Sequence, residues 1–313
     1  MNPSTPTRHK TQDTRHASAA RDGTSRAALA QQLLVTKQLS ELLPALEQRN
    51  IKSVLLKGTA FWTCIYEPGE RPVSDIDILI RTTDTDLADE ALRSLGYSGE
   101  RNPLRPASER EYNNRHYYPH PKEHGLMLEL HRRILHRQRY DIDTEGLFSR
   151  AIPCRIGSAS ALQLSVEDNL LHLAMHRTVH GDGFTPDCRN IEDAHRIIAR
   201  MPVDWMALVD RAHAWGCATA LWILLDSVRS RNDSAVPHGV LASLEPSIAR
   251  RRYMDLVLES DHGMRLFRWP AMATWPRRLL LLPLILDHPR QHSRFVAYYA
   301  WLRVRDAWEA RSP

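Results

Sequence analysis

The sequence predicts an α+β fold: a β-sheet with flanking helices, followed by an all-helical C-terminal region. Up to about residue 150, short apolar runs alternate with turn residues, and residues 74–80 alternate acidic with apolar side chains, as a strand does. Beyond residue 150, apolar side chains recur every three or four positions, the period of helices. These observations divide the chain into a disordered tail over 1–27, a sheet-containing domain over 28–150 and a helical domain over 151–313.

The composition is that of an ordinary folded protein. Hydrophobic residues make up 42% of the 313 residues and charged residues 25%, which excludes a wholly disordered, collagen-like or coiled-coil chain. The longest uncharged apolar run, Leu279–Leu286, is far shorter than the roughly 20 residues that cross a bilayer. The N-terminus has no apolar segment of a secretion signal, and the four cysteines form no CxxC pair. We therefore expect a cytoplasmic protein without a transmembrane segment.

The first elements follow from composition and leucine spacing. Residues 1–27 are rich in Ser, Thr, Arg, Asp and Ala and carry almost no large apolar side chain, which predicts the disordered tail. Leucines at three- to four-residue spacing predict a helix over 26–48. A short apolar run that ends at glycine predicts a strand and turn over 53–58, and a short helix can follow over 59–66.

Further strands and helices follow the loop at Pro68–Pro72. The alternation over 74–80 predicts a strand, and Asp84 can cap a helix that Gly96 ends. Residues 111–119 and 126–134 predict two more strands. A start resembling a capping box at residues 165–168 then opens a series of helices. We expect these over about 165–180, 189–200, 204–215 and 217–229, with more to the end of the chain.

Two acidic residues on the predicted strand form the sharpest chemical feature. Side chains at i and i+2 share one face of a strand, so Asp75 and Asp77 lie side by side while Ile76 and Ile78 face the core. Adjacent carboxylates repel each other unless a proton or a cation lies between them. Hard oxygen ligands suit Mg²⁺, with Mn²⁺ as the alternative, and substrate phosphates can complete the coordination. We therefore predict a metal site at Asp75 and Asp77.

Glu129 is the candidate for a third carboxylate at this site. It lies on another strand with alternating apolar residues and shares a face with His131. Three carboxylates on neighbouring strands can hold the two metal ions of a phosphoryl or nucleotidyl transfer site. We therefore assign Asp75, Asp77 and Glu129 as catalytic metal ligands and place His131 among the residues that bind the nucleotide.

The turn before the short helix supplies the candidate phosphate contacts. A junction of strand, glycine and helix exposes backbone N–H groups to an anion, and Gly58 and Thr59 stand at such a junction. Lys57 precedes them, and Arg71 lies just upstream of the acidic strand. We predict that these four residues bind the phosphates of a nucleotide.

These motifs resemble those of the DNA polymerase β-like nucleotidyltransferase superfamily. More narrowly, they resemble a family of uncharacterised nucleotidyltransferases with a Leu-Lys-Gly turn, an Arg-x-x-x-Asp-Ile-Asp-x-Leu strand and a later Asp/Glu-x-His strand. This sequence matches them at Leu56–Gly58, Arg71–Leu79 and Glu129–His131, and matches the helical tail of the family at Leu170–His176 and Ile191–Asp193. The resemblance covers roughly residues 30 to 200. It implies a mixed sheet and a catalytic domain over 28–150.

The activity that the resemblance implies is metal-dependent transfer of a nucleoside monophosphate from a nucleoside triphosphate. ATP is the default donor because of its abundance in cells, and the acceptor is a hydroxyl or phosphate on a peptide, small molecule or RNA. Two alternatives stay open. One is a peptide-modifying phosphate or sugar transferase that uses a nucleotide or nucleotide-sugar donor. The other is a non-catalytic module of the same fold that binds nucleic acid through its basic C-terminal helices.

Two features of the helical region have no assigned role. His172, His176 and His180 recur at four-residue spacing, too far apart along a helix to bind one ion together, so they form either a polar seam facing the catalytic domain or satisfied core histidines. The C-terminal segment combines arginines with tryptophans and leucines, which predicts a packed helical core or a membrane-surface helix. The tryptophans of this segment are Trp269, Trp275, Trp301 and Trp308.

Overall fold

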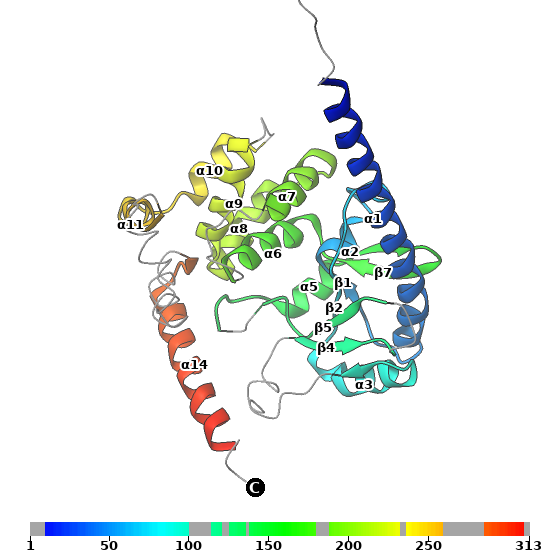
Figure 1. Ribbon diagram of the computed structural model, residues 1–313. Coiled ribbons are helices and arrows are strands. Elements are labelled where there is room, and N and C mark those ends of the chain that lie inside the picture. The colour runs from blue at the N-terminus through cyan, green and yellow to red at the C-terminus, as the bar shows by residue number, and fades with distance from the viewer. Residues whose placement is uncertain are drawn as a thin grey trace, which may run out of the picture.

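The computed structural model describes residues 10–99, 114–120, 125–135, 138–179, 188–231, 236–258 and 285–309. A mixed β-sheet with its covering helices occupies one side of the molecule, and a mostly helical region occupies the other (Figure 1). This arrangement confirms the predicted α+β fold.

Seven strands form one sheet within the described residues, in the order β3-β4-β5-β2-β1-β7-β6. Strand β2 is parallel to β5 on one side and antiparallel to β1 on the other, and β1 is parallel to β7. The sheet is therefore mixed. Its strands are β1 (Val54–Leu55), β2 (Asp75–Leu79), β3 (Ser98–Gly99), β4 (Asn114–Tyr118), β5 (Met127–His131), β6 (Ile152–Ile156) and β7 (Ala159–Gln163).

The central strands β2 and β5 bury one face and present the acidic residues on the other. Strand geometry turns successive side chains to opposite faces, so the apolar residues between the acidic ones point into the core. These apolar residues are Ile76, Ile78, Leu128 and Leu130, and none is more than 1% exposed.

Helices cover the sheet and form the rest of the described chain. The helix α1 (Lys10–Glu47) runs along the sheet, and α3 (Thr85–Ser94) lies at its edge (Figure 1). A one-turn 3-10 helix, η1 (Thr82–Asp84), precedes α3. The others are α2 (Lys57–Phe61), α5 (Thr144–Arg150), α6 (Val166–Val179), α7 (Cys188–Arg200), α8 (Trp205–Trp215), α9 (Ala218–Arg231), α10 (His238–Leu244), α11 (Ile248–Leu258) and α14 (Pro289–Glu309).

The predicted helices of the second half correspond closely to α6, α7, α8 and α9, and the predicted strands of the first half correspond to β1, β2, β4 and β5. The hairpin of β6 and β7 is the main difference, because residues 152–163 fall in the region expected to be all helical. Gly157, at φ 59°, turns this hairpin, and β7 pairs with β1 in the central sheet. Strands β6 and β7 have only five residues each, too few for an alternation of apolar and polar side chains to be recognised beside the long helical patterns.

Helix α1 overlaps the segment 1–27 that the sequence predicts as a disordered tail. Helix α1 begins at Lys10, so the backbone over 10–27 is helical, while residues 1–9 lie outside the described part of the chain. Alanine and arginine, both frequent in this stretch, are good helix formers even without a large apolar face.

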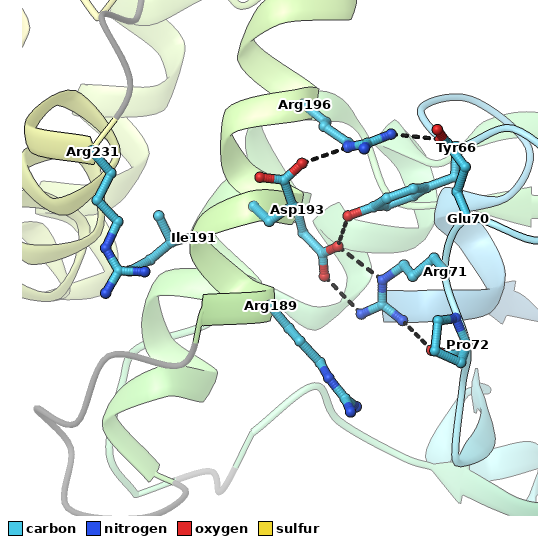
Figure 2. Close-up of a pocket in the computed structure, with 10 residues that line it drawn as sticks. Tyr66, Glu70, Arg71, Pro72, Arg189, Ile191, Asp193, Arg196 and Arg231 are labelled. Carbon is cyan, nitrogen blue, oxygen red and sulfur yellow. Dashed lines mark hydrogen bonds and ion pairs between the residues drawn. The ribbon is translucent and has the colours of Figure 1, made fainter. Parts of the chain in front are cut away.

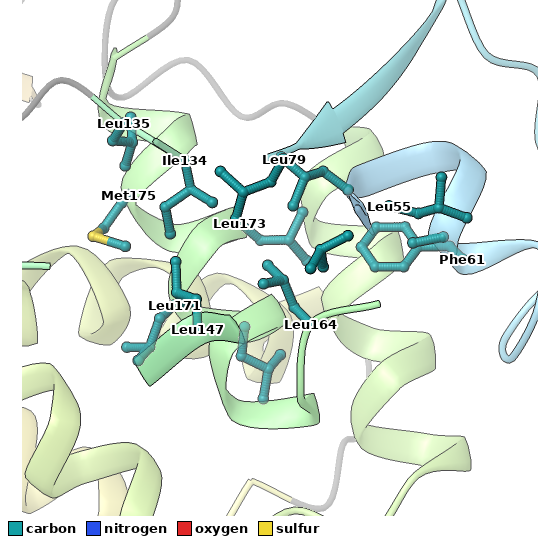
Figure 3. Close-up of a cluster of buried hydrophobic side chains, with 14 of the residues drawn as sticks. Leu55, Phe61, Leu79, Ile134, Leu135, Leu147, Leu164, Leu171, Leu173 and Met175 are labelled. Atoms are coloured by element: carbon teal, nitrogen blue, oxygen red, sulfur yellow. The ribbon is translucent and has the colours of Figure 1, made fainter. Parts of the chain in front are cut away.

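The apolar core runs without a break from the sheet into the helical region. Leu55, Phe61 and Leu79 come from the sheet side, and Leu171 and Leu173 come from α6; all belong to one buried cluster (Figure 3). The helical region is therefore packed directly against the sheet that carries the acidic residues.

The C-terminal features are only partly visible in the structure. Trp301 and Trp308 are exposed on α14, at 43% and 68%. Trp269, Trp275 and the run Leu279–Leu284 lie outside the described residues, as does His180. Among the helices that the structure describes, none combines the length and the apolar character needed to cross a membrane.

Candidate active site

The acidic residues meet because β2 and β5 are adjacent parallel strands. In their register Asp77 lies opposite Glu129, and Leu79 lies opposite His131. Residues that are opposite each other in such a pair have neighbouring side chains on the same face. Asp75 precedes Asp77 by two residues and lies opposite Met127, nearer the start of both strands.

Asp77 is the centre of the site. Its residue is only 2% exposed, and two basic groups contact the same oxygen: Lys57 Nζ donates to Asp77 Oδ1 at 2.8 Å, and His131 Nε2 lies 2.7 Å from it. A buried carboxylate is stable only when it is paired and hydrogen-bonded. Lys57 and His131 therefore hold Asp77 in its charged form.

Glu129 extends this cluster towards β4. One of its oxygens lies 3.3 Å from His131 Nε2, and the other lies 3.3 Å from His116 Nε2. His116 lies opposite Glu129 in the antiparallel pairing of β4 and β5. The sequence placed His116 on a strand, but only the order of the strands in the sheet shows that it contacts Glu129.

Opposing electrostatic effects set the pKa values in this cluster. Burial raises the pKa of Asp77, but its hydrogen bond with His131 and the charge of Lys57 outweigh that effect and bring it below its usual value. Burial likewise opposes ionisation of Glu129, yet its bonds with His116 and His131 lower its pKa. Burial lowers the pKa of His131, but its bonds to Asp77 and Glu129 raise it above the usual value. The carboxylates and His131 thus stabilise each other's charged forms.

The residues present fit a divalent cation. Asp77, Glu129 and His131 each offer one ligand atom, and these atoms all lie within 4.8 Å of one another. Burial and the negative charge of Asp77 raise the pKa of Asp75, so a cation near both carboxylates would stabilise the charged form of Asp75. The carboxylate oxygens suit Mg²⁺ and Mn²⁺.

This cluster differs from the predicted set of ligands in one member. The sequence predicted Asp75, Asp77 and Glu129, whereas the group that the structure brings together contains His131 in place of Asp75. Asp75 accepts a hydrogen bond of 3.0 Å from Ser74 Oγ and lies beside the group at the start of β2. Its position leaves it available as an additional ligand rather than a member of the innermost cluster.

The turn that contains Lys57, Gly58 and Thr59 adjoins these carboxylates. Lys57 has a φ of 50°, a left-handed conformation that costs a non-glycine residue roughly 1 kcal/mol or more. This conformation accompanies the ion pair between Lys57 and Asp77. Thr59 is 1% exposed and its hydroxyl donates to the backbone oxygen of Leu56 at 3.3 Å, so the structure turns that hydroxyl towards its own turn.

Arg71 is paired with a carboxylate from the helical region. Its Nε and Nη2 donate to the two oxygens of Asp193 on α7, at 2.8 Å and 2.7 Å, and Tyr66 Oη donates to the same carboxylate at 2.6 Å (Figure 2). Asp193 is 0% exposed. The sequence placed Arg71 among the phosphate contacts and did not connect it with Asp193, which lies 122 residues later.

Gly58 is needed because the Arg71 side chain packs against it. A Cβ atom at position 58 would lie 2.4 Å from Arg71 Nη1 and 2.5 Å from Val73 Cγ1. We expect Gly58→Ala to lower the free energy of unfolding by about 1–3 kcal/mol, the usual cost of overpacking, by displacing Arg71 and Val73. Chemical denaturation measures this effect.

Gly239→Ala is the matched control for this variant. Gly239 lies in α10, and an added Cβ atom there meets nothing within 4 Å. We expect that change to be neutral or to stabilise the protein by about 0.5–1 kcal/mol, as alanine does in a helix. Equal stabilities for the two variants would contradict the packing of Arg71 on Gly58.

Comparison with known proteins places this site in a family. The model of a family described as "Uncharacterised nucleotidyltransferase" matches residues 14–231, which include every residue of the site. No curated protein sequence matches the chain.

Several solved structures are similar to the chain at low identity. One is ANT(2")-Ia in complex with adenylyl-2"-tobramycin, with 13% identity, 63% of this chain and 97% of that chain covered, and a TM-score of 0.38. Another is MenT4, a nucleotidyltransferase toxin from Mycobacterium tuberculosis H37Rv, with 14% identity, 95% and 99% covered, and a TM-score of 0.42. A third is an antigenic nucleotidyltransferase-like protein from Paracoccidioides brasiliensis, with 15% identity, 69% and 94% covered, and a TM-score of 0.44.

Proposed function

The chain belongs to the uncharacterised nucleotidyltransferase family, and from that premise we propose that it transfers a nucleoside monophosphate from a nucleoside triphosphate to an acceptor. The observation that carries the proposal is the register of β2 and β5, which brings Asp77 and Glu129 together beside Lys57. A nucleotidyltransferase needs carboxylates for a divalent cation and a basic group for the phosphates, and this arrangement supplies both.

We assign the metal to Asp77 and Glu129, with Asp75 as a further ligand and Mg²⁺, or Mn²⁺, as the ion. When bound there, the ion would neutralise the phosphates and lower the pKa of the attacking group. His131 holds the Asp77 carboxylate in place through its 2.7 Å contact and supports its negative charge. A histidine in this position orients a ligand even when it does not itself contact the ion.

Lys57 is the residue best placed to contact the donor phosphates. Its side chain is 21% exposed while its ammonium group contacts Asp77, so it lies at the boundary between the buried carboxylate and solvent. Gly58 follows it, and its lack of a side chain lets the Arg71 guanidinium lie against the turn. Thr59 contributes to this turn through its bond to Leu56, and Arg71 borders the turn from the other side.

ATP is the proposed donor, and a hydroxyl or phosphate on a peptide, small molecule or RNA is the proposed acceptor. Radiolabel at two positions of ATP tests the reaction without knowledge of the acceptor. Incubation of the protein with Mg²⁺ and a cell extract should transfer label from α-labelled ATP to an acceptor and release pyrophosphate. Transfer from γ-labelled ATP would instead indicate a phosphotransferase, and transfer from a labelled nucleotide sugar would indicate a glycosyltransferase. No transfer from any of them would favour a non-catalytic binding module.

The stability of the metal-free protein should depend on the charge of His131. Because the folded pKa of His131 is raised, its contribution is fully present below its unfolded pKa of about 6.5 and is lost as the pH rises through the folded value. We expect wild type to exceed His131→Gln in stability most clearly between about pH 5 and 6.5, since Asp77 and Glu129 are charged there. Thermal unfolding in a chelating buffer from pH 5 to 9 measures this. A difference that stays constant or grows with pH would contradict the assigned charges.

A further inference from the structure

A pocket of about 450 Å³ lies between the loop before β2 and the helices α7 and α9. The loop lines it with Tyr66 and with the segment Glu70–Pro72, and α7 lines it from the helical region (Figure 2). The Arg71 side chain forms part of this wall and also packs against Gly58. Arg71 therefore links the wall of this pocket to the turn that borders the carboxylates.

The walls of this pocket are rich in arginine. Arg71, Arg189, Arg196 and Arg231 line it, against three carboxylates, those of Glu70, Glu192 and Asp193. The charge of the pocket is positive, and the guanidinium group is the side chain best suited to bidentate contact with phosphate.

Two of the arginines are fixed in place by the carboxylates. Asp193 binds Arg71 through two hydrogen bonds. Arg196 donates to Glu192 at 2.7 Å and to Glu70 at 2.6 Å, and its guanidinium lies over the Tyr66 ring at 4.4 Å. Each of the three carboxylates thus contacts Arg71 or Arg196 and fixes its guanidinium group in the wall.

The other two arginines line the pocket from different helices. Arg189, in the first turn of α7, extends towards the loop that carries Arg71 and Pro72, and Arg231 reaches the pocket from the last turn of α9 (Figure 2). Both are exposed to solvent. With them, the lining holds four arginines and three carboxylates, and these two stand at a place that a ligand can enter.

We propose that this pocket binds a phosphate group of a substrate, with Arg189 and Arg231 as its contacts. The proposal deepens the proposed function and rests on it for the identity of the substrate. The phosphate has two sources: the triphosphate of the donor, or a phosphate carried by the acceptor. In either case arginines of the helical region bind a phosphate of the substrate, while the proposed metal ligands lie on the sheet.

The test compares two double variants that remove equal charge. Arg189→Ala/Arg231→Ala empties the pocket of its two exposed arginines, and Arg229→Ala/Arg252→Ala removes two exposed arginines that do not line it. ATP, adenosine and inorganic phosphate are titrated into each, the last with the protein saturated with ATP. A loss of at least about 10-fold in affinity is expected at the pocket, equivalent to one charge-assisted hydrogen bond.

The pattern of losses identifies the source. Weaker ATP binding with unchanged adenosine binding supports the donor triphosphate, and loss of inorganic phosphate with unchanged ATP binding supports an acceptor phosphate. Equal affinities of the two double variants for ATP and for phosphate would overturn the proposal. Asp77→Asn, measured in parallel, keeps the two claims separate: unchanged binding of Mg²⁺–ATP in that variant would refute the proposed function, while the arginine variants still report on the pocket.

Discussion

Asp77→Asn is expected to lower the rate of nucleotidyl transfer by at least about 100-fold. Loss of a residue that only hydrogen-bonds to a metal ligand can already lower activity by up to about 100-fold. Lys57 and His131 both contact Asp77 directly. Glu129 is connected to Asp77 through its contact with His131. The amide keeps the shape of the side chain but removes the charge that binds a cation. Release of pyrophosphate from ATP in the presence of Mg²⁺ measures the effect.

Asp168→Asn is the matched control for this variant. Asp168 is 0% exposed and, like Asp77, is bound by two basic side chains, here Arg150 and Arg211. Both variants break a buried charged cluster and should lose stability, but only Asp77→Asn should lose metal-dependent activity. Equal loss of activity in both, at temperatures where both are folded, would show that Asp77 has only a structural role.

Asp193→Ala is expected to have the largest effect on stability, about 3–5 kcal/mol, because it leaves Arg71 buried without its partner. The carboxylate accepts two hydrogen bonds from Arg71 and one from Tyr66, and all three are lost together. These bonds join the loop before β2 to α7, so their loss should also loosen the turn that borders the site. Urea denaturation measures the change.

Two further variants serve as controls for this prediction: one breaks an exposed ion pair, and the other removes both charges of the buried pair. Glu145 pairs with Arg81 at 3.0 Å but is 69% exposed, so Glu145→Ala should cost less than about 1 kcal/mol. Arg71→Met together with Asp193→Leu should recover much of the stability lost in Asp193→Ala, because it removes the unpaired charge. If Asp193→Ala cost no more than Glu145→Ala, the buried network would not hold the two regions together.

The sequence predicted those parts of the site that follow from local periodicity. Alternation along residues 74–80 placed Asp75 and Asp77 on one face, and the same argument placed Glu129 beside His131. Helices α6 to α9 were equally clear, because long apolar stripes repeat over three or more turns. Short elements such as β6 and β7 gave no comparable signal, and their membership in the central sheet depends on β7 pairing with β1.

Contacts between distant segments could not be predicted in the same way. The pairing of β4 with β5 brings His116 to Glu129, and the packing of α7 against the loop brings Asp193 to Arg71. Neither depends on a spacing along the chain. The exchange of Asp75 for His131 in the innermost cluster has the same origin, since strand register and side-chain length decide which ligand atoms meet.

A titration of Mn²⁺ followed by electron paramagnetic resonance tests the central claim most directly, because it requires neither donor nor acceptor. Wild type and Asp168→Asn should bind the ion with a defined stoichiometry, and Asp77→Asn should lose that binding. Mn²⁺ binding that is the same in Asp77→Asn as in wild type, or absent from wild type even when ATP is present, would contradict a metal centre at Asp77 and Glu129.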